Sequence, residues 1–360
     1  MRKAPLFLLV MTMLLALALC QCLLPARRVS EMENRLLAQS PHISFRAFLE
    51  GSLADNVEDF AADQLPLRDG FVAVYSTMQY SLGRRAVGDA ILGEGMLFDQ
   101  SAVWSERNVR LNAAALNDLA TLTGKDVCLM AVPSAAMIYP EKLPAHAPVA
   151  DEAALLAVAE KETRLLPLLT ALQKAKDAPL YYTTDHHWTV DGAQIGYAVA
   201  CDALGLSPVK MGEREVYPGF YGSFYVRYPL PWVKSDTFAW MPVEGLQLTI
   251  NGEEYATLLD TDVLAGRDKY AALLHGNHAL VELNNDAAPE GTLLVIKDSY
   301  ANALLPLLAQ HYRRVVAVDP RYFAGNIVEL VNTYEGEMIL CVYGMNTLST
   351  GRTIALLEGL

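Results

Sequence analysis

Residues 185 to 188 read Asp-His-His-Trp, in a chain that has only seven histidines and four tryptophans. A carboxylate that accepts the Nδ1–H of an imidazole fixes its tautomer and stabilises the imidazolium formed when Nε2 takes a proton. The apolar run at 179–183 predicts a strand, so we expect an extended segment in which residues two apart share a face. Asp185 and His187 would then point one way and His186 the other. The motif therefore predicts half of a nucleophilic triad.

Ser299 is the candidate for the other half. It follows the apolar run 292–296 and precedes a helix-like segment at 300–312. In open parallel sheets, active sites collect at the carboxyl ends of strands, and backbone N–H groups at a helix N-terminus favour an oxyanion. Taken alone, Ser299 could equally be a helix N-cap. Because the strands at 179–183 and 292–296 can end at the same sheet edge, we expect the two motifs to meet.

A metal site is the competing interpretation of the Asp-His-His cluster, since all three residues are zinc ligand types. Adjacent histidines on opposite faces of an extended chain suit one metal ion poorly. His275 and His278 could complement them, but their segment has the composition of a turn. We therefore expect neither a metal nor any other cofactor.

The elements that must position these motifs alternate between helix-like and strand-like patterns. Near-continuous apolar strands separated by helices predict a parallel sheet covered on both faces. The segment 206–290 interrupts this alternation and is rich in Tyr, Trp, Gly and Pro, which predicts a β-rich insertion or lid. The predicted helices are 105–124, 151–175, 190–205, 300–312 and 325–334, and the predicted strands are 127–133, 179–183, 292–298, 313–320 and 337–344.

The N-terminus predicts a membrane segment. Arg2 and Lys3 precede an uncharged run at 5–25, and about 20 apolar residues suffice for a helix to cross a bilayer. We interpret the run as a transmembrane signal anchor; the alternative is a signal peptide cleaved after Ala16-Leu17-Ala18, which has small residues at its first and third positions. The basic flanks are nearly balanced, so charge alone does not determine orientation. With the N-terminus inside, both interpretations place the remaining chain outside the cytoplasm.

The expected organisation has four parts. Residues 1–4 form a short cytoplasmic tail, 5–25 the anchor, 26–88 a helical stem packed on the domain, and 89–360 the α/β domain with its insertion. The net charge of −13 argues against nucleic-acid binding, which needs basic surface against phosphates.

The motifs resemble those of a known family. Asp-His-His-Trp followed by Thr-x-x-Gly-Ala at 189–193 is similar to the signature of the DHHW proteins. Those proteins resemble the SGNH-hydrolase-like domains of the periplasmic proteins that O-acetylate alginate. The resemblance extends to D-S-Y-A-N-A-L at 298–304 and, as weaker support, to 132–144 and 343–348. It spans residues 40 to 355, most of the exported chain.

This resemblance implies a three-layer α/β SGNH-hydrolase-like fold in which Asp185 orients, His187 is general base and acid, and Ser299 is the nucleophile. It implies transfer of an acyl group, here acetyl, to an exopolysaccharide or cell-wall glycan through an acyl-serine. It also implies a partner, a membrane-bound O-acyltransferase that supplies acetyl groups across the membrane. The alternatives are a carbohydrate esterase of the same fold and a non-catalytic envelope protein that binds a glycan or an assembly partner.

The chain departs from the family pattern at one position, because Lys297 stands where Gly usually precedes Asp-Ser. Trp188 would either pack under the histidine or line a glycan site, and Tyr300 would either pack or touch substrate. The candidate oxyanion donors are Gly222, Ser223, Asn302 and Asn346.

Overall fold

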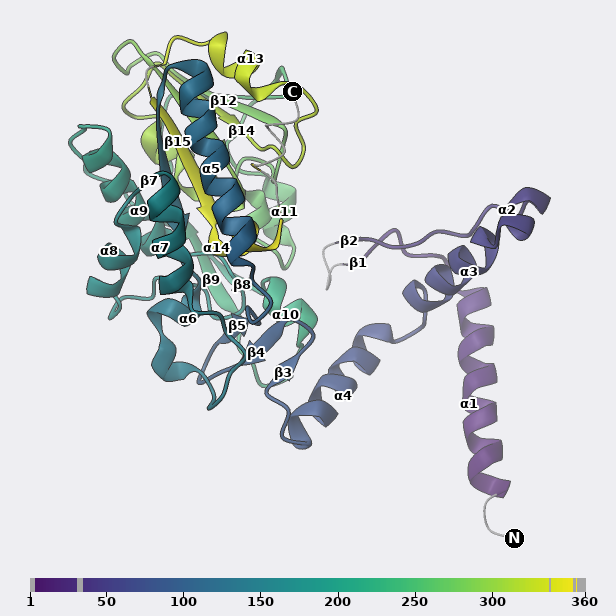
Figure 1. Cartoon of the computed structure of the whole chain (residues 1–360). Coiled ribbons are helices and arrows are strands. Elements are labelled where there is room, and N and C mark those ends of the chain that lie inside the picture. The colour runs from purple at the N-terminus through teal and green to yellow at the C-terminus, as the bar shows by residue number, and fades with distance from the viewer. Residues whose placement is uncertain (1–3, 31–34, 337, 352–353, 355–360) are drawn as a thin grey trace. The chain divides into compact units, whose positions relative to one another are not determined.

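A computed structural model describes residues 4–30, 35–336, 338–351 and 354 of the chain, which divides into two compact units. Unit 1 comprises residues 1–84 and 228–232, and unit 2 comprises residues 85–227 and 233–360 (Figure 1). Of the expected cytoplasmic tail at 1–4, only Ala4 lies within the described residues.

Unit 1 begins with the apolar helix α1 (Ala4–Leu23). Its residues Pro5–Leu23 are long and apolar enough to cross a membrane, and none of this span is buried in protein. A signal sequence near the N-terminus has the same length and composition. The other elements of the unit are β1 (Val29–Ser30), β2 (Arg35–Leu36), α2 (Phe45–Glu50), α3 (Ser52–Asp63) and α4 (Arg68–Ser81).

Unit 2 is built on an eight-stranded sheet with the order β11-β10-β12-β14-β13-β15-β6-β7. The strands from β14 to β7 run parallel, as expected, whereas β12, β10 and β11 add to the β14 edge in antiparallel fashion. The strands are β6 (Asp126–Val132), β7 (Arg164–Leu165), β10 (Leu246–Ile250), β11 (Glu253–Tyr255), β12 (Leu280–Asn285), β13 (Thr292–Lys297), β14 (Arg314–Val318) and β15 (Met338–Gly344).

Helices cover both faces of this sheet, which makes three layers (Figure 1). Side chains of β6 alternate between the two layers: Val127 and Leu129 pack on one side, Cys128 and Met130 on the other. The first layer contains α5 (Glu106–Thr123), α7 (Glu152–Glu162), α13 (Ile327–Asn332) and α14 (Met345–Thr350), and the second contains α6 (Ala135–Ile138), α8 (Leu168–Lys174), α9 (Val190–Ala203) and α12 (Leu305–Leu308).

The β-rich segment 206–290 serves two different structures. Its strands β10, β11 and β12 extend the main sheet, while β8 (Glu215–Phe220) and β9 (Asp236–Trp240) form a separate antiparallel pair. The remaining small elements of unit 2 are β3 (Ala86–Val87), β4 (Ala90–Leu92), β5 (Leu97–Asp99), α10 (Ser223–Arg227), α11 (Thr261–Ala265) and the 3₁₀ turns η1 (Pro140–Lys142), η2 (Tyr270–Ala272) and η3 (Ser299–Ala303).

Two predicted helices are shorter in the structure than the sequence pattern suggested. The segment 151–175 is divided into α7, β7 and α8, because Pro167 lacks an N–H and cannot continue a helix. The segment 300–312 begins as the 3₁₀ turn η3, and the short α12 follows with Pro306 in its first turn. Leucine-rich runs with helical spacing therefore overestimated helix length at both places.

Candidate active site

The structure brings the two motifs together at the carboxyl edge of the sheet. His187 Nε2 lies 2.8 Å from Ser299 Oγ, and His187 Nδ1 lies 2.6 Å from Asp185 Oδ1. With the proton on Nδ1, the imidazole donates to the carboxylate and can accept the serine O–H on Nε2. Asp185 and His187 are buried, whereas Ser299 is half-buried and can be reached from solvent.

The local path of the Asp-His-His-Trp segment differs from the predicted extended strand. The chain turns back on itself: the N–H of Tyr182 donates to the carbonyl of His187, and only an isolated bridge joins Tyr181 to Trp188. Asp185 Oδ1 also accepts the backbone N–H of His187 at 2.9 Å, the geometry of an Asx-turn. The expectation of strand alternation was therefore wrong, although the pairing of Asp185 with His187 is present.

His186 consequently does not point away from the site. Its ring centroid lies 3.8 Å from that of His187, and its Nδ1 lies 2.8 Å from Ser223 Oγ. Burial, together with the neighbouring His187, lowers the pKa of His186. The structure thus places a second, largely neutral imidazole against the first.

A bidentate contact that sequence reasoning missed holds the turn in place. Asp236 Oδ1 accepts the N–H and hydroxyl of Thr183 at 2.9 and 2.8 Å, and its Oδ2 accepts those of Thr184 at 2.8 and 2.6 Å. The Thr-Thr pair directly before Asp185 was the sequence feature that could have indicated this turn, since hydroxyl residues in turns commonly bond backbone or carboxylate groups.

The segment Gly222-Ser223 supports Asp185. The N–H of Ser223 donates to Asp185 Oδ2 at 2.7 Å, and the N–H of Gly222 donates to Thr184 Oγ1 at 3.1 Å. A Cβ on Gly222 would lie 2.1 Å from the Asp185 Cβ, so only glycine fits there. Both amides are engaged, which argues against the expected role of these residues as oxyanion donors.

The charge of Asp185 follows from these contacts. Burial by itself would raise the pKa of this carboxyl group. The His186 and His187 rings and the hydrogen bonds from His187 and Ser223 outweigh that effect and hold the pKa well below its ordinary value. Asp185 is therefore a carboxylate throughout the neutral pH range, as an orienting acid must be.

Ser299 is positioned by the residue before it. Asp298 is buried and caps η3: its Oδ1 accepts the Tyr300 N–H at 3.0 Å, and its Oδ2 accepts the Gly344 N–H and the Thr347 hydroxyl, each at 2.8 Å. Asp298 thereby ties the end of β13 to the end of the neighbouring strand β15. In the part of the chain that the structure describes, the N–H of Ser299 itself donates no hydrogen bond within the protein.

The residue that departs from the family pattern, Lys297, has a structural partner. Its side chain is fully buried, and its Nζ donates to Asn302 Oδ1 at 2.6 Å. Burial lowers the pKa of Lys297 to about 8. Asn302 in turn donates to the Gly276 carbonyl at 3.1 Å, so its amide is engaged and unsuited to an oxyanion. Asn346 lies half-buried on α14.

Trp188 and Tyr300 pack next to the two histidines. Trp188 has no exposed surface, its Nε1 donates to the Tyr300 carbonyl at 3.1 Å, and the two rings meet edge to face at 5.7 Å. The Tyr300 hydroxyl donates to the His186 carbonyl at 2.6 Å. Of the two alternatives for Trp188, packing under the histidine is the one that its burial supports.

The Thr-x-x-Gly-Ala pattern after this motif also has a packing explanation. The Thr189 hydroxyl accepts the Gly192 N–H and caps α9. A Cβ on Gly192 would lie 2.5 Å from the Leu180 carbonyl oxygen, and one on Gly196 would lie 2.8 Å from the Trp188 ring. Glycines therefore let α9 approach the motif closely.

Tyr270 is a second residue that sequence reasoning missed. Its ring stacks on the His187 imidazole, with centroids 3.7 Å apart and planes inclined by 11°. Its hydroxyl donates to the Ser299 carbonyl at 3.1 Å, so one side chain touches both the base and the nucleophile segment. Tyr270 lies in η2, within the irregular part of 206–290, where no periodic pattern indicated it.

Among the described residues, Asp185, His186 and His187 form the one group of three potential metal ligands, with ligand atoms within 4.8 Å of one another. In this arrangement both Nδ1 atoms face Asp185, and the His187 Nδ1 is within hydrogen-bond distance of it. The residues are thus arranged as a hydrogen-bonded network that includes Ser299.

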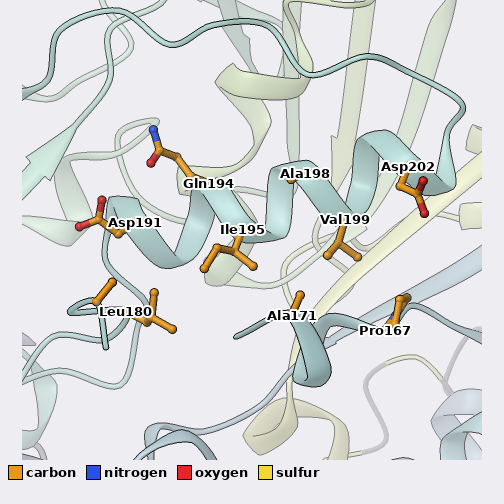
Figure 2. A pocket seen from close by; sticks show the side chains of 10 residues that line it. Pro167, Ala171, Leu180, Asp191, Gln194, Ile195, Ala198, Val199 and Asp202 are labelled. Carbon is orange, nitrogen blue, oxygen red and sulfur yellow. The ribbon is translucent and has the colours of Figure 1, made fainter. Parts of the chain in front are cut away.

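A separate hollow of about 520 Å³ lies between α8 and α9 (Figure 2). Its lining is mainly apolar, with Ile195 and Val199 facing Pro167 and Ala171 across it. None of the three residues of the Asp-His-Ser arrangement lines it, so it is a feature distinct from the candidate active site.

Comparisons with known proteins identify the families that segments of this chain resemble. Residues 166–318 match the family model of the DHHW proteins, and residues 94–216 match that of the SGNH hydrolase-like domain of the acetyltransferase AlgX. A search of curated protein sequences finds no significant match.

Solved structures share the fold. A DHHW family protein from Eubacterium siraeum superposes with a TM-score of 0.61 at 17% identity, covering 76% of this chain and 98% of that one. Bacillus cereus PatB1 superposes with a TM-score of 0.61 at 20% identity, covering 73% and 98%. The same protein with a sulfonyl adduct gives 0.60 at 19% identity, covering 75% and 99%. The resemblance to the DHHW proteins and to the SGNH-hydrolase-like acetyltransferase domain, inferred from the motifs, is therefore confirmed for the matched segments.

Proposed function

We propose that the protein transfers an acyl group, specifically acetyl, to a hydroxyl of an exopolysaccharide or cell-wall glycan through an acyl-serine on Ser299. The observation that carries this proposal is the continuous hydrogen-bonded chain from Asp185 through His187 to Ser299. The match of residues 94–216 to an acetyltransferase family model supports the choice of acetyl.

In the first half-reaction, Ser299 Oγ attacks the carbonyl carbon of the acyl donor while its proton passes to His187 Nε2. The tetrahedral intermediate collapses, and the leaving oxygen takes that proton from the imidazolium. Asp185 stabilises the transient imidazolium, because it remains ionised. The product is an acetyl ester on Ser299 and the protonated leaving group.

The Ser299 backbone N–H is our proposed oxyanion donor. The N–H of Tyr300 is engaged by Asp298, and those of Gly222 and Ser223 by Thr184 and Asp185. A free N–H at the start of η3, on the residue that carries the nucleophile, can donate to the negative oxygen of the intermediate.

In the second half-reaction, a sugar hydroxyl gives its proton to His187 Nε2 and attacks the acetyl carbonyl carbon. The Ser299 oxygen departs and takes the proton back, so the site returns to its starting state. If water takes the place of the sugar, the same steps make the protein an esterase.

We further propose the setting of this reaction. With α1 as a single-pass membrane anchor, the α/β unit acts outside the cytoplasm on envelope glycans. A membrane-bound O-acyltransferase that delivers acetyl groups across the membrane is the proposed partner, following from the family resemblance alone.

Acyl capture tests the proposal. The full chain in detergent is mixed with an activated acetyl ester and examined by intact-mass spectrometry. We expect one acetyl adduct on the wild type and on Ser81→Ala, an exposed serine of α4 used as a control, and none on Ser299→Ala. Absence of both adduct and ester hydrolysis would favour the non-catalytic alternative.

A sulfonyl fluoride is a second probe, suggested by the adduct described for PatB1. We expect sulfonylation of the Ser299 peptide, and protection of that peptide by prior acetylation. Adding glycan oligosaccharides to the acetylated protein separates the two enzyme alternatives: appearance of acetylated sugar indicates a transferase, and release of acetate alone indicates an esterase.

A further inference from the structure

Helix α4 of unit 1 has its polar and apolar faces in the reverse of the usual arrangement. The residues that it buries include Ser76 and Gln79, which are 1% and 7% exposed. The side-chain oxygen atoms Ser76 Oγ and Gln79 Oε1 have no hydrogen-bond partner among the described residues. Its outward face is apolar, with 42% to 78% of each side chain exposed: Leu67, Phe71, Val74, Tyr75, Met78 and Leu82.

This outward face, the α4 stripe, follows helical spacing and forms one continuous surface. A helix facing water normally buries its apolar stripe, because exposing it is unfavourable while burying unpaired polar atoms is also costly. A stripe of this kind on a monomer marks a site of contact with a partner or a membrane.

Contacts within unit 1 indicate which of these covers the stripe. Arg27 lies four residues beyond the end of α1. Its backbone N–H and C=O are both bound by the Gln64 side chain, at 2.9 and 2.8 Å, and its guanidinium contacts the Asp69 carboxylate at 3.9 Å. Asp69 is in the first turn of α4. The start of α4 is therefore held at the end of the proposed membrane helix.

A second contact lies within the last turn of α1, where the Gln21 side chain donates to the Ala61 carbonyl at 3.1 Å. If α1 spans the hydrocarbon core, its last turn lies at the level of the lipid headgroups. The segment that leads into α4 is consequently held at that level.

An aromatic residue of the stripe also fits a lipid surface. Tyr75 is half-exposed within the stripe itself. Tryptophan and tyrosine are enriched where bilayer and water meet.

We propose that the α4 stripe lies in the headgroup region of the same bilayer that α1 crosses, as an in-plane second membrane contact. With 14 residues, α4 is about 21 Å long, too short to cross a hydrocarbon core of about 30 Å. An interfacial position satisfies both its length and its single apolar face.

Depth-dependent quenching tests the proposal on the full chain. Cys20→Ala and Cys22→Ala remove the exposed thiols, and Cys128, Cys201 and Cys341 are fully buried. Val74→Cys or Met78→Cys is labelled with an environment-sensitive fluorophore and reconstituted in phosphatidylcholine vesicles that carry a headgroup spin label. Leu122→Cys on α5, an equally exposed apolar position, is the matched control.

We expect blue-shifted emission and strong loss of fluorescence to the lipid spin label at positions 74 and 78, with neither effect at 122. Quenching by aqueous iodide at 74 and 78 would overturn the proposal, because the stripe would then face water. Protection of the labelled positions from both quenchers, together with a disulfide between copies of unlabelled Met78→Cys, would also overturn it and indicate a dimer. Failure of the chain to float with the vesicles would overturn it as well. None of these readouts depends on acyl transfer.

Discussion

The imidazole of His187 lies flat against the phenol ring of Tyr270, with centroids 3.7 Å apart. The Tyr270 hydroxyl reaches past the histidine to the Ser299 carbonyl. Burial raises the pKa of Tyr270 well above its ordinary value, so the phenol stays protonated and remains a donor. One aromatic residue thus fixes both partners of the proposed proton transfer.

Tyr270→Phe should therefore lower activity only modestly, because the stacked ring remains and a single hydrogen bond is lost. Tyr270→Leu removes the flat surface and should cost roughly 100-fold, the effect of a base displaced by about 1 Å. The rate of acetyl-adduct formation measures both variants, and the thermal unfolding midpoint shows that each is folded. Equal rates for Tyr270→Leu and the wild type would contradict a positioning role.

The two adjacent histidines should differ in importance. His187→Ala removes the group that contacts Ser299 Oγ, and we expect a loss of about 10²- to 10⁴-fold in adduct formation. His186→Ala removes a ring that contacts His187 and Ser223 but not the nucleophile, so it should retain far more activity. A comparable loss in both variants would show that His186 takes part in proton transfer.

Gly222 should tolerate no side chain. In Gly222→Ala the new Cβ would meet the Asp185 side chain, so the carboxylate must shift away from His187. We expect adduct formation to fall roughly 100-fold, the effect of such a displacement at a catalytic group. Gly212→Ala is the matched control, since a Cβ there has open space around it, and it should behave as wild type. Wild-type rates for Gly222→Ala would refute the close contact.

Glu152 should make stability depend on pH. Its buried carboxyl group accepts the Ser134 N–H at 2.8 Å and pairs with the Ser134 hydroxyl. Burial raises its pKa from 4.5 to about 7, so its contribution to stability is fully present below 4.5 and is lost as pH rises through 7. The amide of Glu152→Gln does not titrate, so this loss should disappear.

Urea unfolding at about pH 5 and about pH 8 measures the difference, which we expect to reach at most roughly 3 kcal/mol between wild type and variant. Asp99, whose pKa burial raises to about 6, contributes with the same sign in both proteins, and because the Glu152 charge is only the smallest cause of its shift, this contribution largely cancels in the comparison. Parallel pH curves for the two proteins would show that Glu152 is not the titrating group.

Much of the architecture could be predicted from local patterns. Continuous apolar runs such as 292–296 become buried parallel strands, because both faces of such strands are covered. Hydrophobic periodicity predicted a single helix over 151–175, but Pro167 separates α7 from α8 there. They also failed to assign β10, β11 and β12 to the main sheet, since strand pairing between distant segments leaves no local signal.

The sequence by itself determined which residue types stand at each motif, and so the Asp185–His187 pair and its distant partner Ser299. Only the tertiary structure decided how they meet. The turn at 183–187 is set by Asp236, and the amides of Gly222 and Ser223 are occupied by polar side chains of the turn. Hydrogen-bond partners far apart in the chain depend on packing of the whole unit, and residue spacing carries no record of them.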